Sequence, residues 1–201
     1  TGYVVQAIVN NFAPLLFLPF QNTYNISMGR ITVLITVNFI VQLLTDLLSA
    51  GFIDRIGYRA AMLAAHAASA AGLISLPLLP ELLPDPFAGL LIAVGIYAVG
   101  GGLLEVLVSP VAEALPTKNK EKTMSMLHSF YCWGHVAVVF FSTVFFSLFG
   151  VDNWRIMAAV WALVPLYNLF IFRKVPMCTL TEDGEKGLSF AGLVRRPTFW
   201  I

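Results

Sequence analysis

Long runs of hydrophobic residues, separated by short polar breaks, follow one another along the chain. The six runs lie at residues 2–20, 31–52, 59–79, 87–111, 122–149 and 153–173. A bilayer core about 30 Å thick requires roughly 20 mostly apolar residues in a helix. Runs of this length satisfy their backbone hydrogen bonds in lipid when they are helical. The pattern therefore predicts an all-α membrane protein in which residues 1–174 form a bundle of six transmembrane helices.

The breaks between the runs are rich in residues that favour turns and the ends of helices. They read QNTYN at 21–25, LPELLPDPF at 79–87, LPTKNKEK at 115–122 and GVDNW at 150–154. After the sixth run, residues 175–197 contain the polar stretch TEDGEK and predict a cytoplasmic linker, while 198–201 begin another apolar run. Residue 1 is Thr. Both ends indicate a piece of a longer protein that continues into a seventh span.

Composition supports the membrane assignment. The 201 residues are 58% hydrophobic and only 11% charged, and their mean hydropathy is +0.81. A soluble domain usually carries about 25% charged residues, and one this poor in charge would leave large apolar patches in water. The lipid bilayer is therefore the expected solvent. The net charge of +1 is spread over short loops, so no nucleic-acid partner is predicted.

Lysine and arginine are distributed unequally between the two sets of loops. One set holds Arg55, Arg59, Lys118, Lys120, Lys122, Arg173, Lys174, Lys186, Arg195 and Arg196, and the other holds Arg30 and Arg155. Loops rich in these residues stay in the cytoplasm. The bias of ten against two therefore predicts a cytoplasmic N-terminus, in a multi-pass protein of the cell membrane (the inner or plasma membrane).

The break between the second and third runs carries a specific motif, AGFIDRIGYRA at 50–60. Its central residues are Asp54, Arg55, Gly57 and Arg59. The spacing resembles the signature of the loop between helices two and three in the major facilitator superfamily, G-x-x-x-D-R/K-x-G-x-R/K-R/K. Ala50 stands at the first glycine position of that signature, and Ala60 stands at its last basic position.

The resemblance implies the amino-terminal half of a twelve-helix fold, built from two inverted three-helix repeats. It also implies secondary active transport by alternating access and a missing carboxy-terminal half of six helices as partner. The loop would act as a conformational latch between the halves, with Ala50 allowing close approach and Gly57 adopting a positive φ. Arg55 and Arg59 have a simpler alternative role, which is to set the topology. Asp46, in the second span, belongs either to the latch or to the transport path.

A second pair of stretches resembles the fucose-permease-like branch of the superfamily, whose members are sugar/proton symporters. GGGLLEVLVSPVAEALP at 100–116 is similar to its fourth helix, and MLHSFYCWGHV at 126–136 is similar to its fifth. The resemblance places a functional carboxylate at Glu105. It implies that the substrate is a small polar solute such as a sugar and that transport is coupled to protons.

Polar residues inside the spans recur on single helical faces. Besides Glu105, the candidates for the substrate and proton site are Asn10, Asn11, Asn38, Gln42, Tyr131, His128 and His135. Such residues usually face the interior of a bundle or a water-filled path, and Gln6 shares the spacing of Asn10. For Asn11 and Asn38, hydrogen bonding that only holds helices together is an equal alternative. His66 lies among small residues and is expected to be a packing histidine.

Glu105 and His128 are expected at one depth, because each lies about six residues from the cytoplasmic end of its run, or roughly 9 Å. We hypothesise that they face each other or share a water, and that Glu105 carries the coupled proton. Neutral amides, with Phe130, Tyr131 and Trp133 available for stacking, favour an uncharged polyhydroxylated ligand. A nucleoside or a small drug would suit the same residues.

A rival interpretation is a six-span channel or a membrane scaffold that acts as an oligomer. No enzyme is predicted, because no nucleophile has a base at a recognisable spacing and no phosphate-binding glycine loop occurs. No cofactor or metal is expected, since the three histidines lack the spacing of metal ligands. The two cysteines, Cys132 and Cys178, indicate no disulfide framework.

Overall fold

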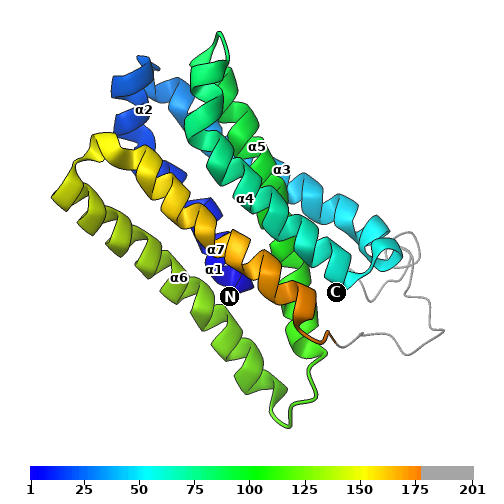
Figure 1. Ribbon diagram of the computed structural model, residues 1–201. Helices are drawn as coiled ribbons and strands as arrows, with labels where there is room; N and C mark the ends of the chain where they lie inside the picture. The colour runs from blue at the N-terminus through cyan, green and yellow to red at the C-terminus, as the bar shows by residue number, and fades with distance from the viewer. Residues whose placement is uncertain (178–201) are drawn as a thin grey trace.

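The computed structural model describes residues 1–177, except for the side chains of Ala50 and Asp54. Most of the predicted linker and the predicted start of a seventh span, at 198–201, lie outside the described residues. The described part is all-helical (Figure 1). Its elements are α1 (Gly2–Asn11), η1 (Ala13–Leu16), α2 (Phe17–Tyr24), α3 (Met28–Ile56), α4 (Tyr58–Leu82), α5 (Pro86–Glu113), α6 (Lys120–Phe149), η2 (Val151–Asn153) and α7 (Trp154–Lys174).

Six helical segments in the described part are long and apolar enough to cross a membrane. They correspond to the six runs in the sequence. The first of them is interrupted, because α1 ends at Asn11 and a 3-10 segment containing Pro14 precedes α2. Proline lacks the backbone N–H that an α-helix needs at an interior position. The break lies directly after Asn10 and Asn11, so it falls beside candidate polar residues.

The turn between α3 and α4 is shorter than the sequence pattern indicates. The second run was expected to end near residue 52, but α3 continues to Ile56 and α4 begins at Tyr58. Gly57 alone joins them, with a φ of +84°. A positive φ is readily adopted only by glycine, which lets the chain reverse within one residue. Asp54 and Arg55 therefore belong to the last turn of a helix.

Other helix ends follow from local chemistry. Asp85 precedes α5 and accepts a hydrogen bond from the Phe87 backbone N–H at 3.0 Å, with Pro86 at the first helical position. Asn119 caps α6 in the same way through the Lys122 backbone N–H. Such side chains satisfy amide groups that a helix start leaves unpaired. These caps fix the starts of the two helices that carry Glu105 and His128.

Part of the helix packing has an internal symmetry, although the close pair of α4 with α5 has only a slight counterpart in α1 with α7. The second span, α3, packs on the fourth, α5, and the fifth, α6, packs on the first, α1; α4 also packs on α7, and α1 on α5. If each of spans one to three is matched with the span three places later, α1 corresponds to α5 and α3 corresponds to α6. The contact of α3 with α5 then corresponds to the contact of α6 with α1. Spans one and four run in opposite directions. The packing therefore fits two inverted three-helix repeats, as expected for half of a major facilitator fold.

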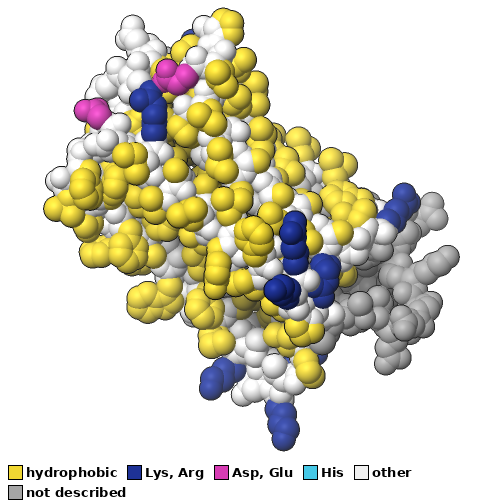
Figure 2. All heavy atoms as spheres, viewed as in Figure 1, with side chains coloured by type: hydrophobic (Ala, Val, Ile, Leu, Met, Phe, Trp, Pro, Cys, Tyr) yellow, Lys and Arg dark blue, Asp and Glu magenta, His cyan; other side chains and the backbone are white. Residues whose placement is uncertain are grey.

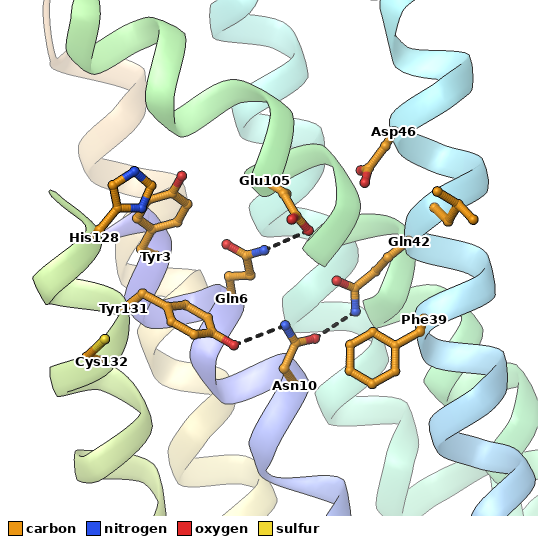
Figure 3. A pocket seen from close by; sticks show the side chains of 11 residues that line it. Tyr3, Gln6, Asn10, Phe39, Gln42, Asp46, Glu105, His128, Tyr131 and Cys132 are labelled. Carbon is orange, nitrogen blue, oxygen red and sulfur yellow. Dashed lines mark hydrogen bonds between the residues drawn. The ribbon is translucent and has the colours of Figure 1, made fainter. Parts of the chain in front are cut away.

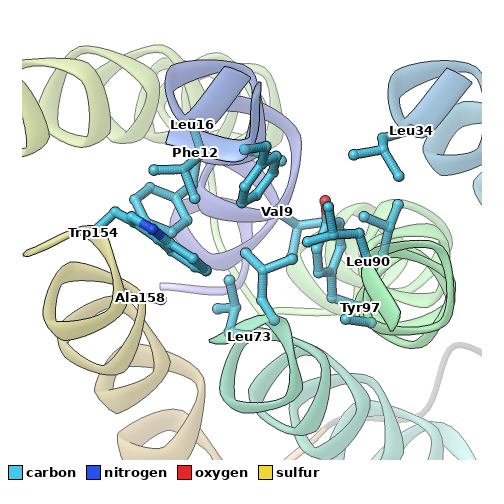
Figure 4. Close-up of a cluster of buried hydrophobic side chains, with 14 of the residues drawn as sticks. Val9, Phe12, Leu16, Leu34, Leu73, Leu90, Tyr97, Trp154 and Ala158 are labelled. Atoms are coloured by element: carbon cyan, nitrogen blue, oxygen red, sulfur yellow. The ribbon is translucent and has the colours of Figure 1, made fainter. Parts of the chain in front are cut away.

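A hydrophobic core fills the half of the bundle next to the loops that join α2 to α3 and α6 to α7 (Figure 4). Val9, Phe12, Leu73, Tyr97 and Trp154 are buried there and come from four different spans. Close contact between α4 and α5 depends on small residues, since a Cβ at Gly72 would collide with the backbone of Tyr97. Small residues at helix interfaces are typical of membrane bundles.

The surface is apolar along the body and charged at the ends (Figure 2). Lys and Arg gather at the end of the bundle where α6 begins and α7 ends, and acidic side chains appear at the opposite end. Large side chains such as Leu48, Trp133 and Leu148 are about 70% exposed, at 68%, 71% and 72%. In water such a surface would be unstable. The chain is an integral multi-pass membrane protein.

Candidate functional site

A cavity of about 580 Å³ lies among α1, α3, α5 and α6 (Figure 3). Its lining residues are Tyr3, Gln6, Asn10, Phe39, Gln42, Leu43, Asp46, Glu105, His128, Tyr131 and Cys132. Each helix contributes through one face, because the residues of α1 and α3 recur at intervals of three or four. The polar stripes recognised in the sequence therefore meet in a common hollow.

Glu105 is held from the first span. The Gln6 side chain donates through Nε2 to Glu105 Oε2 at 3.0 Å. Gln6 is only 5% exposed, whereas Glu105 is exposed to the open side of the cavity. A charge-assisted hydrogen bond from a buried amide fixes the position of a carboxylate. Glu105 is therefore presented to the cavity in a defined orientation and remains accessible from it.

A chain of side-chain amides crosses from the fifth span to the second. Asn10 Nδ2 donates to the Tyr131 hydroxyl at 3.5 Å, and Asn10 Oδ1 accepts from Gln42 Nε2 at 2.7 Å. Asn38 Nδ2 also donates to Asn10 Oδ1 at 3.3 Å, and Gln42 donates to Asn38 Oδ1 at 3.0 Å. These neutral groups both donate and accept. They form a polar wall on which a ligand with hydroxyl groups can exchange hydrogen bonds.

Asp46 reaches the cavity across the glycines of α5. A Cβ on Gly102 would lie 3.1 Å from Asp46 Oδ1 and 2.9 Å from the Cβ of Thr45. A Cβ on Gly101 would lie 3.2 Å from Gln42 Cδ. The missing side chains therefore let the polar stripe of α3 lie directly on the α5 backbone, one turn before Glu105. Figure 3 shows the carboxylates of Asp46 and Glu105 directed toward the same part of the cavity.

The aromatic side of the cavity is built by α1 and α6. The ring of Tyr3 stacks on His128 with 5.7 Å between centroids, and it meets Tyr131 edge to face at 6.3 Å. The Tyr3 hydroxyl is 2.6 Å from Ser109 Oγ. His128 and Glu105 thus line one cavity, and Tyr3 stands beside the histidine (Figure 3). Among the described residues, no hydrogen bond joins Glu105 to His128, and the Glu105 carboxylate accepts from Gln6 instead.

Glu105 and His128 are equally far, counted in residues, from the ends of α5 and α6 that meet at the loop between these helices. Glu105 lies eight residues before the end of α5, and His128 lies eight residues after the start of α6. Both helices extend beyond the predicted runs, so the distance to the helix ends is about 12 Å rather than 9 Å.

The structure brings together most of the residues that the sequence singled out, and leaves some aside. Asn10, Gln42, Asp46, Glu105, His128 and Tyr131 line the cavity, and Asn38 lies behind it on a much smaller hollow. Asn11 donates to the Ala7 carbonyl of its own helix at 2.8 Å. His135 is exposed and lies outside the cavity lining, as do Phe130 and Trp133, which were expected to stack on a ligand.

Besides Leu43, three lining residues were missed by the sequence interpretation. Tyr3 precedes Gln6 and Asn10 at intervals of three and four, and Phe39 precedes Gln42 and Asp46 in the same way. Cys132 lies four residues after His128. The helical period alone would have placed all three beside the predicted polar residues. Apolar and aromatic residues are common throughout the spans, so their composition gave no separate signal.

The loop signature is tied to the rest of the six-helix bundle. The Arg59 guanidinium donates to the backbone carbonyls of Phe172, Arg173 and Val175 at 3.0, 2.8 and 2.8 Å. These are the unpaired carbonyls at the end of α7, where a cation is favourable. Arg55 is exposed in the last turn of α3. Arg59 therefore fastens α4 to α7, and its part in a latch to another half is a separate proposal.

His66 packs between α4 and α7 as expected. It is fully buried, its Nδ1 lies 2.8 Å from the Met62 carbonyl, and its Nε2 lies 3.2 Å from Asn168 Nδ2. Both ring nitrogens thus have partners, which is the usual state of a buried polar group. The residue lies outside the cavity lining.

Comparison with known proteins adds the family. A family model described as Major Facilitator Superfamily matches residues 2–201. The searches of curated proteins and of solved structures each gave no match.

Proposed function

The chain belongs to the major facilitator superfamily, and from this premise we propose that it forms the amino-terminal half of a proton-coupled carrier for a sugar-like solute. The superfamily consists of secondary transporters, which are generally not enzymes. The cavity among α1, α3, α5 and α6 is the observation that carries the proposal. It gathers polar side chains from separate spans into one hollow, which a carrier requires and a simple scaffold does not.

The chemistry of the lining supports an uncharged polyhydroxylated ligand. Gln6, Asn10, Gln42 and Tyr131 supply groups that donate and accept hydrogen bonds, while Tyr3 and Phe39 supply flat apolar faces. A few convergent polar groups with aromatic neighbours are typical of sites for small ligands. This chemistry agrees with the resemblance to the fucose-permease-like branch.

Glu105 is the proposed carrier of the coupled proton. A carboxylate enclosed within the membrane is costly as an anion and much less so when it holds a proton. Protonation from outside would permit the loaded cavity to close and reopen inward, where the proton leaves to cytoplasmic water. His128 lies in the same cavity and would influence this exchange through its own charge.

Rocking of this bundle against a second six-helix bundle would alternate the access of the cavity. The proposed arrangement has a cytoplasmic N-terminus in the inner or plasma membrane, residues 175–197 as a cytoplasmic linker and 198–201 as the start of span seven. Ala50, Asp54, Arg55, Gly57 and Arg59 would meet the second half as a latch when the cavity faces outward.

The test uses the full-length protein in proteoliposomes with radiolabelled L-fucose, D-galactose and D-glucose. With an imposed pH gradient, wild type should accumulate at least one of these sugars. Glu105→Gln should lose accumulation, because its side chain cannot release a proton, but should still exchange labelled for unlabelled sugar. Glu121→Gln, at an exposed site in the first turn of α6, is the matched control and should behave as wild type.

Accumulation by Glu105→Gln equal to that of wild type would remove Glu105 from coupling. Ion conductance without accumulation of any sugar would favour the channel alternative and overturn the carrier proposal.

A further inference from the structure

Asp46 has a position that transport through Glu105 alone leaves unexplained. Its carboxylate lies over Gly102 of α5, one turn from Glu105, and lines the same cavity. Oxygen Oδ1 is buried and has no hydrogen-bond partner in the described structure. Glu105, by contrast, accepts from Gln6. An amide donor stabilises an ionised carboxylate, whereas a buried oxygen without a donor is better tolerated when the group is neutral.

The charged and titratable groups around Asp46 include no strong cation. Glu105 faces it from α5, Tyr3 from α1, and His128, Tyr131 and Cys132 from α6. Neither lysine nor arginine lines the cavity among the described residues. Two carboxylates that share a site cannot both ionise without repulsion, and their protons come off as properties of the pair.

We propose that Asp46 and Glu105 form a carboxylate pair that holds one transported proton between them. This inference rests on the proposed function and makes Asp46 a second coupling residue rather than a part of the latch. When the cavity faces outward, the proton bonds to a carboxylate oxygen of Glu105 or of Asp46, and the other carboxylate of the pair stays ionised. On inward opening, that oxygen–hydrogen bond breaks, and the proton leaves to cytoplasmic water. No other bond changes.

Cys132 offers a reporter of the pair's charge that needs no substrate, because it is exposed and lines the cavity. In full-length protein with every other cysteine replaced, its reaction rates with a cationic and an anionic methanethiosulfonate reagent are measured against pH. The ratio of the two rates cancels the ionisation of the thiol itself. It reports the electrostatic potential of the cavity, which becomes more negative when the pair loses its proton.

The reference protein, which keeps both carboxylates, is expected to show a rise of about tenfold in the cation-to-anion ratio as the pair loses its proton, because the two reagents respond in opposite directions to one unit of charge in the cavity. The experiment is run with His128→Gln in every protein, so that loss of the imidazolium charge does not contribute. Asp46→Asn should abolish the step, and Asp46→Glu should restore it. Asp152→Asn, at an exposed site far from the cavity, should leave the step unchanged. A full step in Asp46→Asn would overturn the inference.

Transport assays then distinguish failure of the carboxylate pair from failure of the proposed carrier function. If wild type accumulates sugar under a pH gradient, Asp46→Asn should lose accumulation and keep exchange. If Asp46→Asn accumulates as wild type does, the pair is wrong and the carrier stands. If wild type accumulates none of the three sugars, the proposed function fails, and the labelling step still decides whether the two carboxylates share a proton.

Discussion

At the scale of single residues, the glycines before Glu105 determine how the site is assembled. Gly101 and Gly102 bring the backbone of α5 against the side chains of Gln42 and Asp46. In a bilayer, helices associate through close packing and not through exclusion of water. A missing Cβ therefore decides whether two polar stripes meet or are held apart.

Replacement of one glycine should consequently separate α3 from α5. A Cβ at Gly102 would lie 2.8 Å from the Gln42 carbonyl and 2.9 Å from Thr45 Cβ, so Gly102→Ala forces backbone to move. We expect this variant to lose at least nine-tenths of sugar uptake and to unfold at a lower temperature in detergent. Gly95→Ala, in the same helix with open space around it, should be neutral or stabilise by about 1 kcal/mol. Equal uptake in the two variants would contradict the role given to Gly102.

Only some of the residues that line the cavity could be predicted from the sequence. Glu105, Gln42 and Asn10 are visible because polar groups are rare inside apolar runs and are costly there. Tyr3 and Phe39 are not, since an aromatic ring within a span is equally at home against lipid, in the core or in a cavity. Asp46 could be identified from the sequence as an acidic residue within a span. Its position against Gly102 could not be predicted, because it depends on how α3 packs on α5.

At the scale of helices, one arginine ties the start of α4 to the end of α7. Arg59 donates to three carbonyls at the end of α7, where the last turn of a helix leaves its acceptors unpaired. The sequence motif drew attention to Arg59 as part of a loop. Its partner lies more than a hundred residues away, which is why the contact could not be predicted from spacing.

Loss of this contact should loosen the helix pair. Hydrogen bonds to charged groups contribute about 1.5–3 kcal/mol each at most, and these are partly exposed, so Arg59→Gln is expected to lower stability by about 1–3 kcal/mol in total. Arg59→Lys should recover part of the loss, because an ammonium is cationic but lacks the planar fork. Thermal unfolding of the full-length protein in detergent measures the effect. Arg55→Gln, at an exposed site in the last turn of α3, is the control; a larger loss there than in Arg59→Gln would exclude the helix-end contact as the main role.

At the scale of the whole molecule, the number of spans and their order were predictable because each run is long enough, at roughly 20 residues or more, to cross the bilayer core. The break in the first span and the one-residue turn at Gly57 were not, since both occur within apolar or mixed sequence. The pairing of α3 with α5 and of α6 with α1 was also hidden: the two triplets of helices share a packing arrangement without a visible repeat in sequence.

The charged side chains at the two ends of the bundle differ in their pairing, and this difference bears on the orientation of the protein in the membrane. The arginines at the end opposite the basic loops are both in ion pairs, Arg30 with Asp85 at 3.7 Å and Arg155 with Glu81 at 2.5 Å. Tyr24 also donates to Glu81, so these charges hold the ends of α2, α4 and α7 together. Lys118, at the other end, has no ion pair in the described part of the chain. Lys118 is thus free to contribute to the topological signal.

Single cysteines placed in a cysteine-free full-length protein would read the orientation directly. Asp152→Cys should react with a membrane-impermeant maleimide in intact cells, because η2 is exposed at the end with paired charges. Lys118→Cys should react only after the membrane is permeabilised, because the positive-inside bias keeps its loop in the cytoplasm. Labelling of Lys118→Cys in intact cells, with Asp152→Cys protected, would reverse the topology. It would also exchange the two sides of the membrane in the proposed cycle, so that the proton would have to enter where it is now expected to leave.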